Sequence, residues 1–235
     1  MERNFERLTH VAIFDAHTII EAGARDCKES VLFSQAYPHA EIYAFECNSE
    51  TLPACRARAK GRIHLIEKAL SDKTGMVAFY PIDTERTVAG TDGSPGASSM
   101  FKLRLAVSGS SIKTRIKFML GRLHEIYYQR EVMVDSLTLE GFMKKEHIDT
   151  IDILWLDAQG SELSILRGLG ERIRDVLYIH TEVEFDEMYQ GQPLFKEVDA
   201  FLLSHGFRFL EFTDRSKSFG DALYISTDPK MIQHT

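Results

Sequence analysis

Residues 18–30 read TIIEAGARDCKES, a short stretch that passes from one kind of secondary structure to another. Thr18–Ala22 is apolar and rich in β-branched residues, which predicts a buried strand that stops at Gly23. Lys28–Ala36 then places apolar side chains at positions 31, 32 and 36, the spacing of a helix. A strand, a glycine turn and a helix in succession are typical of an α/β fold, whose ligands bind where the strands end.

The same alternation continues along the chain. Further strands are predicted at Glu41–Glu46, Ile63–Glu67, Val77–Pro81, Ile151–Leu156, Val176–Val183, Phe207–Phe212 and Ala222–Ser226, and further helices at Glu50–Lys60, Ser161–Ile173 and Leu194–His205. Repeated strand–helix alternation predicts a mainly parallel sheet with helices on both faces. A chain of 235 residues can form one large domain, so we expect a single domain over 1–235.

The composition excludes several classes of protein. With 44% hydrophobic and 27% charged residues, the chain is neither disordered nor collagen-like. No run approaches 18 apolar residues, and the start MERNFERLTH lacks the apolar core of a secretory signal, so we expect no membrane span. Three cysteines without a CxxC pair indicate free thiols and a cytoplasmic protein. The net charge of −7 argues against a dedicated binder of duplex DNA.

Two adjoining stretches at about 84–130 interrupt the alternation. Thr84–Ser99 is rich in glycine and polar residues, which predicts a loop and a candidate lid. Phe101–Arg130 carries seven basic residues and one acid. This basic insert suggests an anionic substrate or partner, while a solvated helix face remains the simpler alternative.

Carboxylates follow the first two strands. Gly23 lets the backbone approach a ligand, but Arg25 and Lys28 stand where a GxGxxG dinucleotide motif needs glycines. Glu21 would repel a pyrophosphate and attract a sulfonium, which favours S-adenosylmethionine over NAD. Glu46 ends the second strand, at the spacing of an acid that binds ribose hydroxyls. A plain tight turn and an exposed strand-end glutamate are the alternatives.

Further candidates follow the later strands. Asp157 ends the strand IDILWL, and Glu162 falls in the first turn of the next helix, where capping alone would also explain it. His180, Glu182 and Glu184 alternate onto one face of the next strand, so His180 is a candidate general base. Without an HExxH motif or a cysteine cluster, we expect no metal site.

Together these residues resemble the FkbM-type S-adenosylmethionine-dependent methyltransferases from about Thr18 to Phe212. The matching segments are EAGARDC (21–27), FECN (45–48), ALSD (69–72), the paired serines Ser98–Ser99, VMVDSLTL (132–139), LWLDAQGSELSILRG (154–168) and HTEVEF (180–185). The chain departs from the family pattern at Glu21, which replaces aspartate, at Cys27, which replaces a glycine, at Cys47, which replaces a proline, at Trp155, where many members carry lysine, and at Gln159, which replaces an acid.

The resemblance implies a class I methyltransferase fold, a seven-stranded sheet with six parallel strands and one antiparallel strand. It implies transfer of a methyl group from S-adenosylmethionine to a hydroxyl oxygen of a small-molecule or sugar-containing acceptor. The expected cofactor-binding residues are Glu21, Gly23, Ala24, Glu46, Cys47, Ala69, Leu70 and Asp157. The expected catalytic residues are Asp157 as general base, His180 as the second choice and Glu182 as an orienting group.

Two other functions stay open at this point. Cys27 and Gln159 are the departures that favour a non-catalytic module, which would bind cofactor or an acidic partner on a methyltransferase scaffold. An NAD-dependent oxidoreductase is disfavoured by the missing glycines.

Overall fold

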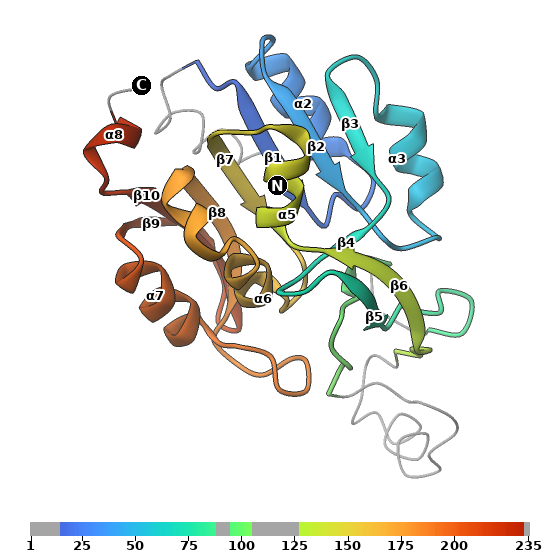
Figure 1. The fold of residues 1–235 in the computed structure, drawn as a ribbon. Helices are drawn as coiled ribbons and strands as arrows, with labels where there is room; N and C mark the ends of the chain where they lie inside the picture. Colours follow the sequence, from blue (N-terminus) through green and yellow to red (C-terminus); the bar gives the residue numbers. More distant parts are fainter. Residues whose placement is uncertain (1–14, 88–94, 105–126, 233–235) are drawn as a thin grey trace.

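The computed structural model describes residues 15–87, 95–104 and 127–232, and within them seven strands form one large sheet (Figure 1). Their spatial order is β3 (Ile63–Ile66), β2 (Glu41–Phe45), β1 (Thr18–Ala22), β7 (Ile151–Leu156), β8 (Val176–Glu184), β10 (Phe219–Ser226) and β9 (Phe207–Arg215). Strand β10 is antiparallel to both of its neighbours, and the other six strands run in one direction. The predicted fold class is confirmed.

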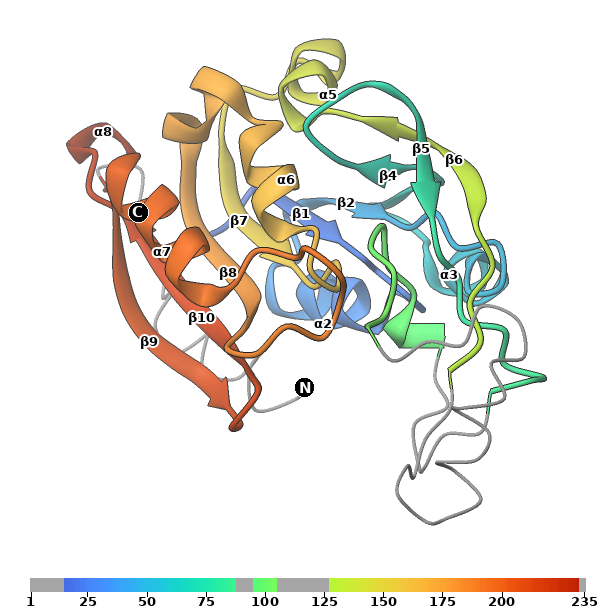
Figure 2. The same ribbon diagram turned by 90° about the horizontal axis from the view of Figure 1, so that it is seen from below.

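Helices cover both faces of this sheet (Figure 2). One face carries α2 (Lys28–Ala36), α3 (Leu52–Arg58) and α8 (Pro229–Ile232), and the other carries α5 (Leu139–Glu146), α6 (Glu162–Arg167) and α7 (Phe195–Ser204). Neighbouring strand residues alternate between the two layers: Ile19 is buried on the α2 side and Ile20 on the α6 side. Because both faces are covered, the central strands are apolar almost throughout, which is why the sequence predicted them within one or two residues.

A smaller sheet lies beside the large one; the sequence predicted one of its strands, at Val77–Pro81, two residues beyond the observed Gly75–Phe79, but not the other two. It consists of β4 (Ala69–Leu70), β6 (Val132–Leu137) and β5 (Gly75–Phe79), with β6 in the middle. In β6 only Ser136 is buried and the other residues are exposed or half-buried, so its sequence lacks the apolar run of a buried strand. Helix α5 follows directly, and the Thr138 side chain caps it by accepting a hydrogen bond from the Gly141 N–H.

One predicted helix is shorter in the structure. The sequence predicted a single helix over Ser161–Ile173, but α6 ends at Arg167 and a short 3-10 helix follows at Gly170–Asp175. Gly170 has a φ of +51°, a left-handed conformation that an α-helix does not contain. This break lets the chain enter β8 immediately afterwards.

Parts of the predicted loop and basic insert, residues 88–94 and 105–126, lie outside the described residues, so the candidate lid and the single-domain prediction stay predictions. In the part of the chain that the structure describes, no helix combines the length and apolarity of a membrane span.

The turn after β1 packs directly against the end of β7. Gly23 has a φ of +81°, and a Cβ atom built on it would lie 1.9 Å from the carbonyl oxygen of Asp157. Only glycine has both the backbone freedom and the missing side chain that this contact requires.

Gly23→Ala is therefore expected to destabilise the fold by about 3 kcal/mol or more, since backbone atoms on both sides would have to move. Chemical denaturation followed by circular dichroism measures this. Gly61→Ala is the matched control, because Gly61 has a φ of +65° and nothing lies within 4 Å of its added Cβ. Equal destabilisation of the two variants would contradict the steric argument.

Candidate active site

A cavity of about 520 Å³ lies where β1, β2, β7 and β8 end. Parallel strands bring their carboxyl ends to one edge of a sheet, so the side chains that follow each strand meet there. Seven of the predicted site residues line this cavity, namely Gly23, Glu46, Cys47, Ala69, Leu70, Asp157 and Glu182. The sequence therefore located the pocket, while their roles in binding and catalysis remain predictions.

Backbone hydrogen bonds fix the turn after β1 between its two neighbouring strands. The N–H groups of Gly23 and Ala24 both donate to the carbonyl oxygen of Phe45, at 3.0 and 2.9 Å. On the other side, the N–H of Asp157 donates to the carbonyl oxygen of Ala22 at 3.0 Å. The turn is consequently held in place before any ligand binds.

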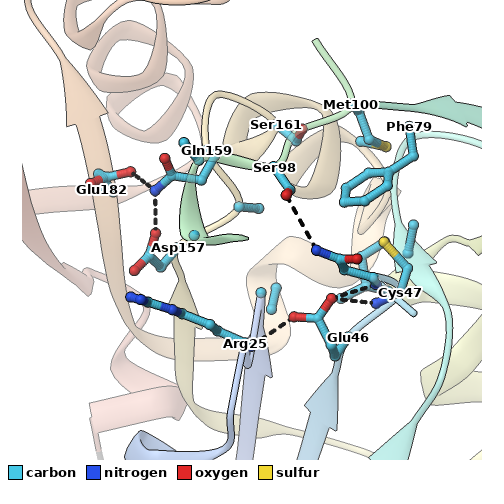
Figure 3. Close-up of a pocket in the computed structure, with 18 of the residues that line it drawn as sticks. Arg25, Glu46, Cys47, Phe79, Ser98, Met100, Asp157, Gln159, Ser161 and Glu182 are labelled. Atoms are coloured by element: carbon cyan, nitrogen blue, oxygen red, sulfur yellow. Dashed lines mark hydrogen bonds between the residues drawn. The ribbon is translucent and has the colours of Figure 1, made fainter. Parts of the chain in front are cut away.

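Glu46 is held by three backbone donors at the cavity wall (Figure 3). Its Oε1 accepts from the N–H groups of Cys47 and Asn48 at 2.8 and 2.6 Å, and its Oε2 accepts from the N–H of Arg25 at 2.7 Å. Burial raises the pKa of Glu46, and these backbone donors oppose that shift. The result is a rigid carboxylate facing the cavity, with lone pairs that can accept further hydrogen bonds.

Two residues in the same turn adopt left-handed conformations without being glycine. Arg25 has a φ of 50° and Cys27 a φ of 57°. Figure 3 shows the Arg25 side chain reaching toward Asp157, and its charge favours the ionised form of that acid. Cys27 is fully buried in the α2 layer and does not line the cavity, so it does not narrow the pocket.

Gln159 connects the ends of β7 and β8. Its Nε2 donates to Asp157 Oδ1 at 2.8 Å and to Glu182 Oε2 at 2.7 Å (Figure 3). Its Oε1 accepts a hydrogen bond from the Tyr189 hydroxyl at 2.8 Å. The sequence singled out Gln159 only as a departure from a family pattern, and it gave no sign of Tyr189.

The carboxyl groups around this amide titrate abnormally. Burial, and then the charge of neighbouring carboxylates, raises the pKa of Glu182 and of Glu162 well above the usual range. Burial also raises the pKa of Glu184 to about 7, and raises that of Asp157. The Gln159 amide, the charge of Arg25 and a side-chain hydrogen bond with Glu182 counteract the shift at Asp157, which is exposed at the cavity wall. Among the described residues, no three His, Cys, Asp or Glu side chains are arranged to hold a metal ion.

Three predicted site residues lie outside the cavity wall. His180 is buried and stacks on Trp155, with ring centroids 3.7 Å apart. Its Nε2 forms a hydrogen bond with the Thr213 hydroxyl. Burial lowers the pKa of His180 to about 3. The prediction of His180 as a base facing the pocket is wrong, because it lies one step deeper in β8 than Glu182.

Glu21 and Ala24 are the other two corrections. The Glu21 carboxyl is buried below the turn and accepts a hydrogen bond from the Ser30 hydroxyl of α2. Burial raises the pKa of Glu21 well above its usual range. Ala24 is buried in the same layer. Alternation along β1 places Glu21 on the α2 side together with Ile19, and Ala24 packs into the same layer from the turn that follows the strand, so neither lines the cavity.

A segment around the short 3-10 helix Pro95–Ala97 crosses the mouth of the pocket. The Ser98 hydroxyl contacts Asn48 Nδ2, which donates to it at 3.2 Å, and accepts a further bond from the N–H of Ile82 at 3.0 Å. The Ser99 hydroxyl donates to the carbonyl oxygen of Gln159 at 2.6 Å. The paired serines of the sequence thus join the β2 end of the pocket to the β7 end. Residues 96–98, which belong to the loop predicted as a lid, therefore form part of the cavity wall.

Glu184→Gln is expected to raise the free energy of unfolding by about 3 kcal/mol at pH 8 and by less than about 1 kcal/mol at pH 5. A carboxyl whose pKa is raised by folding stabilises the folded state while it is protonated, and that contribution is lost as the pH rises from about 4.5 to about 7. Glutamine stays neutral and avoids the loss. Urea denaturation at both pH values measures it, with the exposed Glu85→Gln as control. An equal change at pH 5 and pH 8 would contradict the linkage.

One comparison with a solved structure supports this architecture. The Geobacter metallireducens GS-15 precorrin-6y C5,15-methyltransferase superposes with a TM-score of 0.50 at 11% identity, covering 96% of this chain and 89% of that chain. An S-adenosylmethionine-dependent methyltransferase from Aquifex aeolicus gives a TM-score of 0.48 at 10% identity, covering 94% and 88%. At such low identity, the first likeness supports the fold alone.

Comparison of amino-acid sequences gives a closer relationship than the comparison of structures. The 2-O-methyltransferase NoeI of Sinorhizobium fredii (strain NBRC 101917 / NGR234) is 25% identical over 176 residues, which cover 74% of this chain and 66% of the relative. This chain therefore matches about two thirds of that protein's length. The model of the FkbM methyltransferase domain matches residues 21–209, which is most of the chain. The resemblance found from the sequence motifs is confirmed, and the chain belongs to the FkbM methyltransferase family.

Proposed function

We propose that this protein transfers a methyl group from S-adenosylmethionine to a hydroxyl oxygen of a small-molecule or sugar-containing acceptor. Family membership supports the reaction class, and the relative's name, 2-O-methyltransferase, supports oxygen as the atom methylated. The observation that carries the proposal is the Glu46 carboxylate, held by three backbone N–H groups at the cavity beside the Gly23 turn. A fixed carboxylate at this position suits the two hydroxyls of a ribose.

The cavity has the size and chemistry that the cofactor requires. A volume of about 520 Å³ is in the range of small-molecule sites. The Ser161 hydroxyl lines the cavity, is buried and has no hydrogen-bond partner in the described residues, so a bound ligand would satisfy it. Apolar side chains of Leu70, Phe79 and Ile165 line the same cavity and suit the faces of an adenine ring.

The carboxylates on the opposite wall suit the reacting end of the cofactor. When bound, S-adenosylmethionine supplies a methyl group that its sulfonium already activates. We place the methionine portion near Gly23 and Asp157, where ionised Asp157 would attract the positive charge. Asp157 then accepts the proton that the acceptor hydroxyl releases as its oxygen takes the methyl group. Binding in this cavity would hold the acceptor oxygen in line with the methyl group.

We place the hydroxyl groups of the acceptor against Glu182 and Glu184. These carboxyl groups line the cavity and can exchange hydrogen bonds with hydroxyls, whereas ionised Asp157 beside them would repel an anionic group. In the described part of the basic insert, Arg104 pairs with Glu187 at 3.0 Å and Arg130 with Glu50 at 3.7 Å. Because this wall is acidic, we expect any anionic portion of the acceptor to lie toward the mouth of the cavity.

No observation favours the alternative of a non-catalytic module. It rested on Cys27 and Gln159 as departures from the family pattern. Cys27 is buried outside the cavity, and Gln159 joins the two carboxyl groups proposed for catalysis.

Glu46→Ala is expected to weaken binding of S-adenosylhomocysteine at least ~10-fold, since it removes the proposed ribose contact. Isothermal titration calorimetry measures this on the purified protein. Glu46→Gln keeps the size of the side chain in case the alanine variant unfolds, and exposed Glu67→Ala is the control. Equal affinity in wild type and both Glu46 variants would show that the ribose lies elsewhere.

Asp157→Asn is expected to keep its affinity for S-adenosylhomocysteine within a few-fold and to lose roughly 100- to 10,000-fold in turnover, the usual contribution of a general base. The assay follows transfer of a radiolabelled methyl group to a panel of methyl glycosides. Unchanged turnover would remove Asp157 as the base, and no transfer by the wild type to any hydroxyl acceptor would favour the non-catalytic alternative.

A further inference from the structure

Gln159 lies between two carboxyl groups of the cavity wall, exposed Asp157 and half-buried Glu182. Its two N–H groups point one to Asp157 and one to Glu182, at 2.8 and 2.7 Å. Figure 3 shows the amide lying between the two acids at the cavity wall. A neutral amide therefore holds together two groups that would repel each other when both are ionised.

The orientation of this amide is fixed from behind. The Tyr189 hydroxyl donates to Gln159 Oε1 at 2.8 Å, which identifies that atom as the oxygen and leaves both N–H groups for the acids. The backbone carbonyl of Gln159 accepts from the Ser99 hydroxyl, and its φ is 52°. Tyr189 is itself almost completely buried, at 1% exposure. Rotation of the Gln159 side chain would therefore break its hydrogen bonds to Tyr189, Asp157 and Glu182.

We infer that Gln159 is a positioning residue of this chain, whose amide keeps Asp157 ionised and aimed at the reacting groups in the cavity. The inference rests on the proposed function, because it needs Asp157 beside the transferred methyl group. Two N–H donors stabilise carboxylate charge without adding a charge of their own. An acid at position 159 would instead place a third carboxyl group beside Asp157 and Glu182 and would favour their protonated forms.

The hydrogen bond from the Gln159 amide is important because most of the charged groups around Asp157 are acids. The titratable groups that act electrostatically with Asp157, besides Glu182, are Glu21 of β1, Arg25 of the next turn, Glu29 of α2, Glu162 of α6, Glu184 of β8 and Tyr189. Of these groups only Arg25 is a cation, and it favours the ionised form of Asp157. The carboxyl groups and burial oppose ionisation. The Gln159 amide, the Arg25 guanidinium and a side-chain hydrogen bond with Glu182 each lower the pKa of Asp157 and so favour its ionised form.

The charge of Asp157 can be measured without knowing the acceptor. Sinefungin carries an amine where S-adenosylmethionine has its methylsulfonium, and S-adenosylhomocysteine is neutral at that position. An ionised Asp157 should favour sinefungin over S-adenosylhomocysteine, and a protonated Asp157 should remove the preference. The ratio of the two dissociation constants, measured by calorimetry from pH 4.5 to pH 8, therefore reports the ionisation of this carboxyl group in the intact protein.

Gln159→Met removes both N–H groups at similar side-chain length, and we expect the midpoint of the sinefungin preference to move to higher pH by about one unit. Gln159→Glu should move it further, because it adds a carboxyl group. Tyr189→Phe keeps the packing and should give a smaller shift in the same direction, which preserves the test if the Gln159 variants fail to fold. Gln190→Met, at an exposed position, is the matched control and should leave the midpoint unchanged.

The possible results distinguish failure of the positioning role from failure of the proposed function. A midpoint that stays in place in folded Gln159→Met and Tyr189→Phe, even with weaker binding of both compounds, would overturn the positioning role and leave a purely structural one. The proposed function would survive that result. Failure of the wild type to bind either compound would instead overturn the proposed function.

Discussion

The close contact between Gly23 and the backbone of Asp157 is the constraint on which the site depends. The turn after β1 and the end of β7 meet with no room for a side chain between them. Hydrogen bonds from this turn to Phe45 and from Asp157 to Ala22 extend the contact across three strands. Glu46 and Asp157 consequently lie on opposite sides of one turn, at positions fixed by the sheet rather than by flexible loops. A site built in this way is organised before its ligands arrive.

The carboxyl groups in the cavity lower the stability of the fold and supply its chemistry. Burial raises the pKa of Glu182 and Glu184 in the cavity and of Glu162 at the start of α6, so each opposes folding when ionised. Neutral partners such as the Gln159 amide limit this cost and hold the acids at defined separations. Such a concentration of unfavourable groups at one edge of an otherwise apolar sheet is typical of a functional site.

The sequence predicted the parts of this molecule that follow simple periodicity. Strands buried on both faces, such as β1 and β7, were predicted with their observed bounds because their residues are continuously apolar. The strand-end residues Glu46 and Asp157 followed from the same pattern. His180 was mistaken for a pocket residue, because alternation gives the face of a strand but not the depth at which a side chain lies. Sequence spacing also could not reveal Tyr189, which reaches the site from a loop far along the chain.

The two ends of the partly described insert lie close together, and this has a consequence for variation among related chains. The N–H of Leu103 donates to the side-chain oxygen of Gln129 at 2.8 Å, and Ile82 forms a bridge with Gln129. The chain therefore departs from the pocket wall and rejoins it at neighbouring points. Closing a loop between adjacent anchors depends only weakly on loop length, so segments of very different size and charge could be exchanged there while the wall is preserved. Exchange of this segment would change the groups that an acceptor meets and leave the residues of the reaction centre in place.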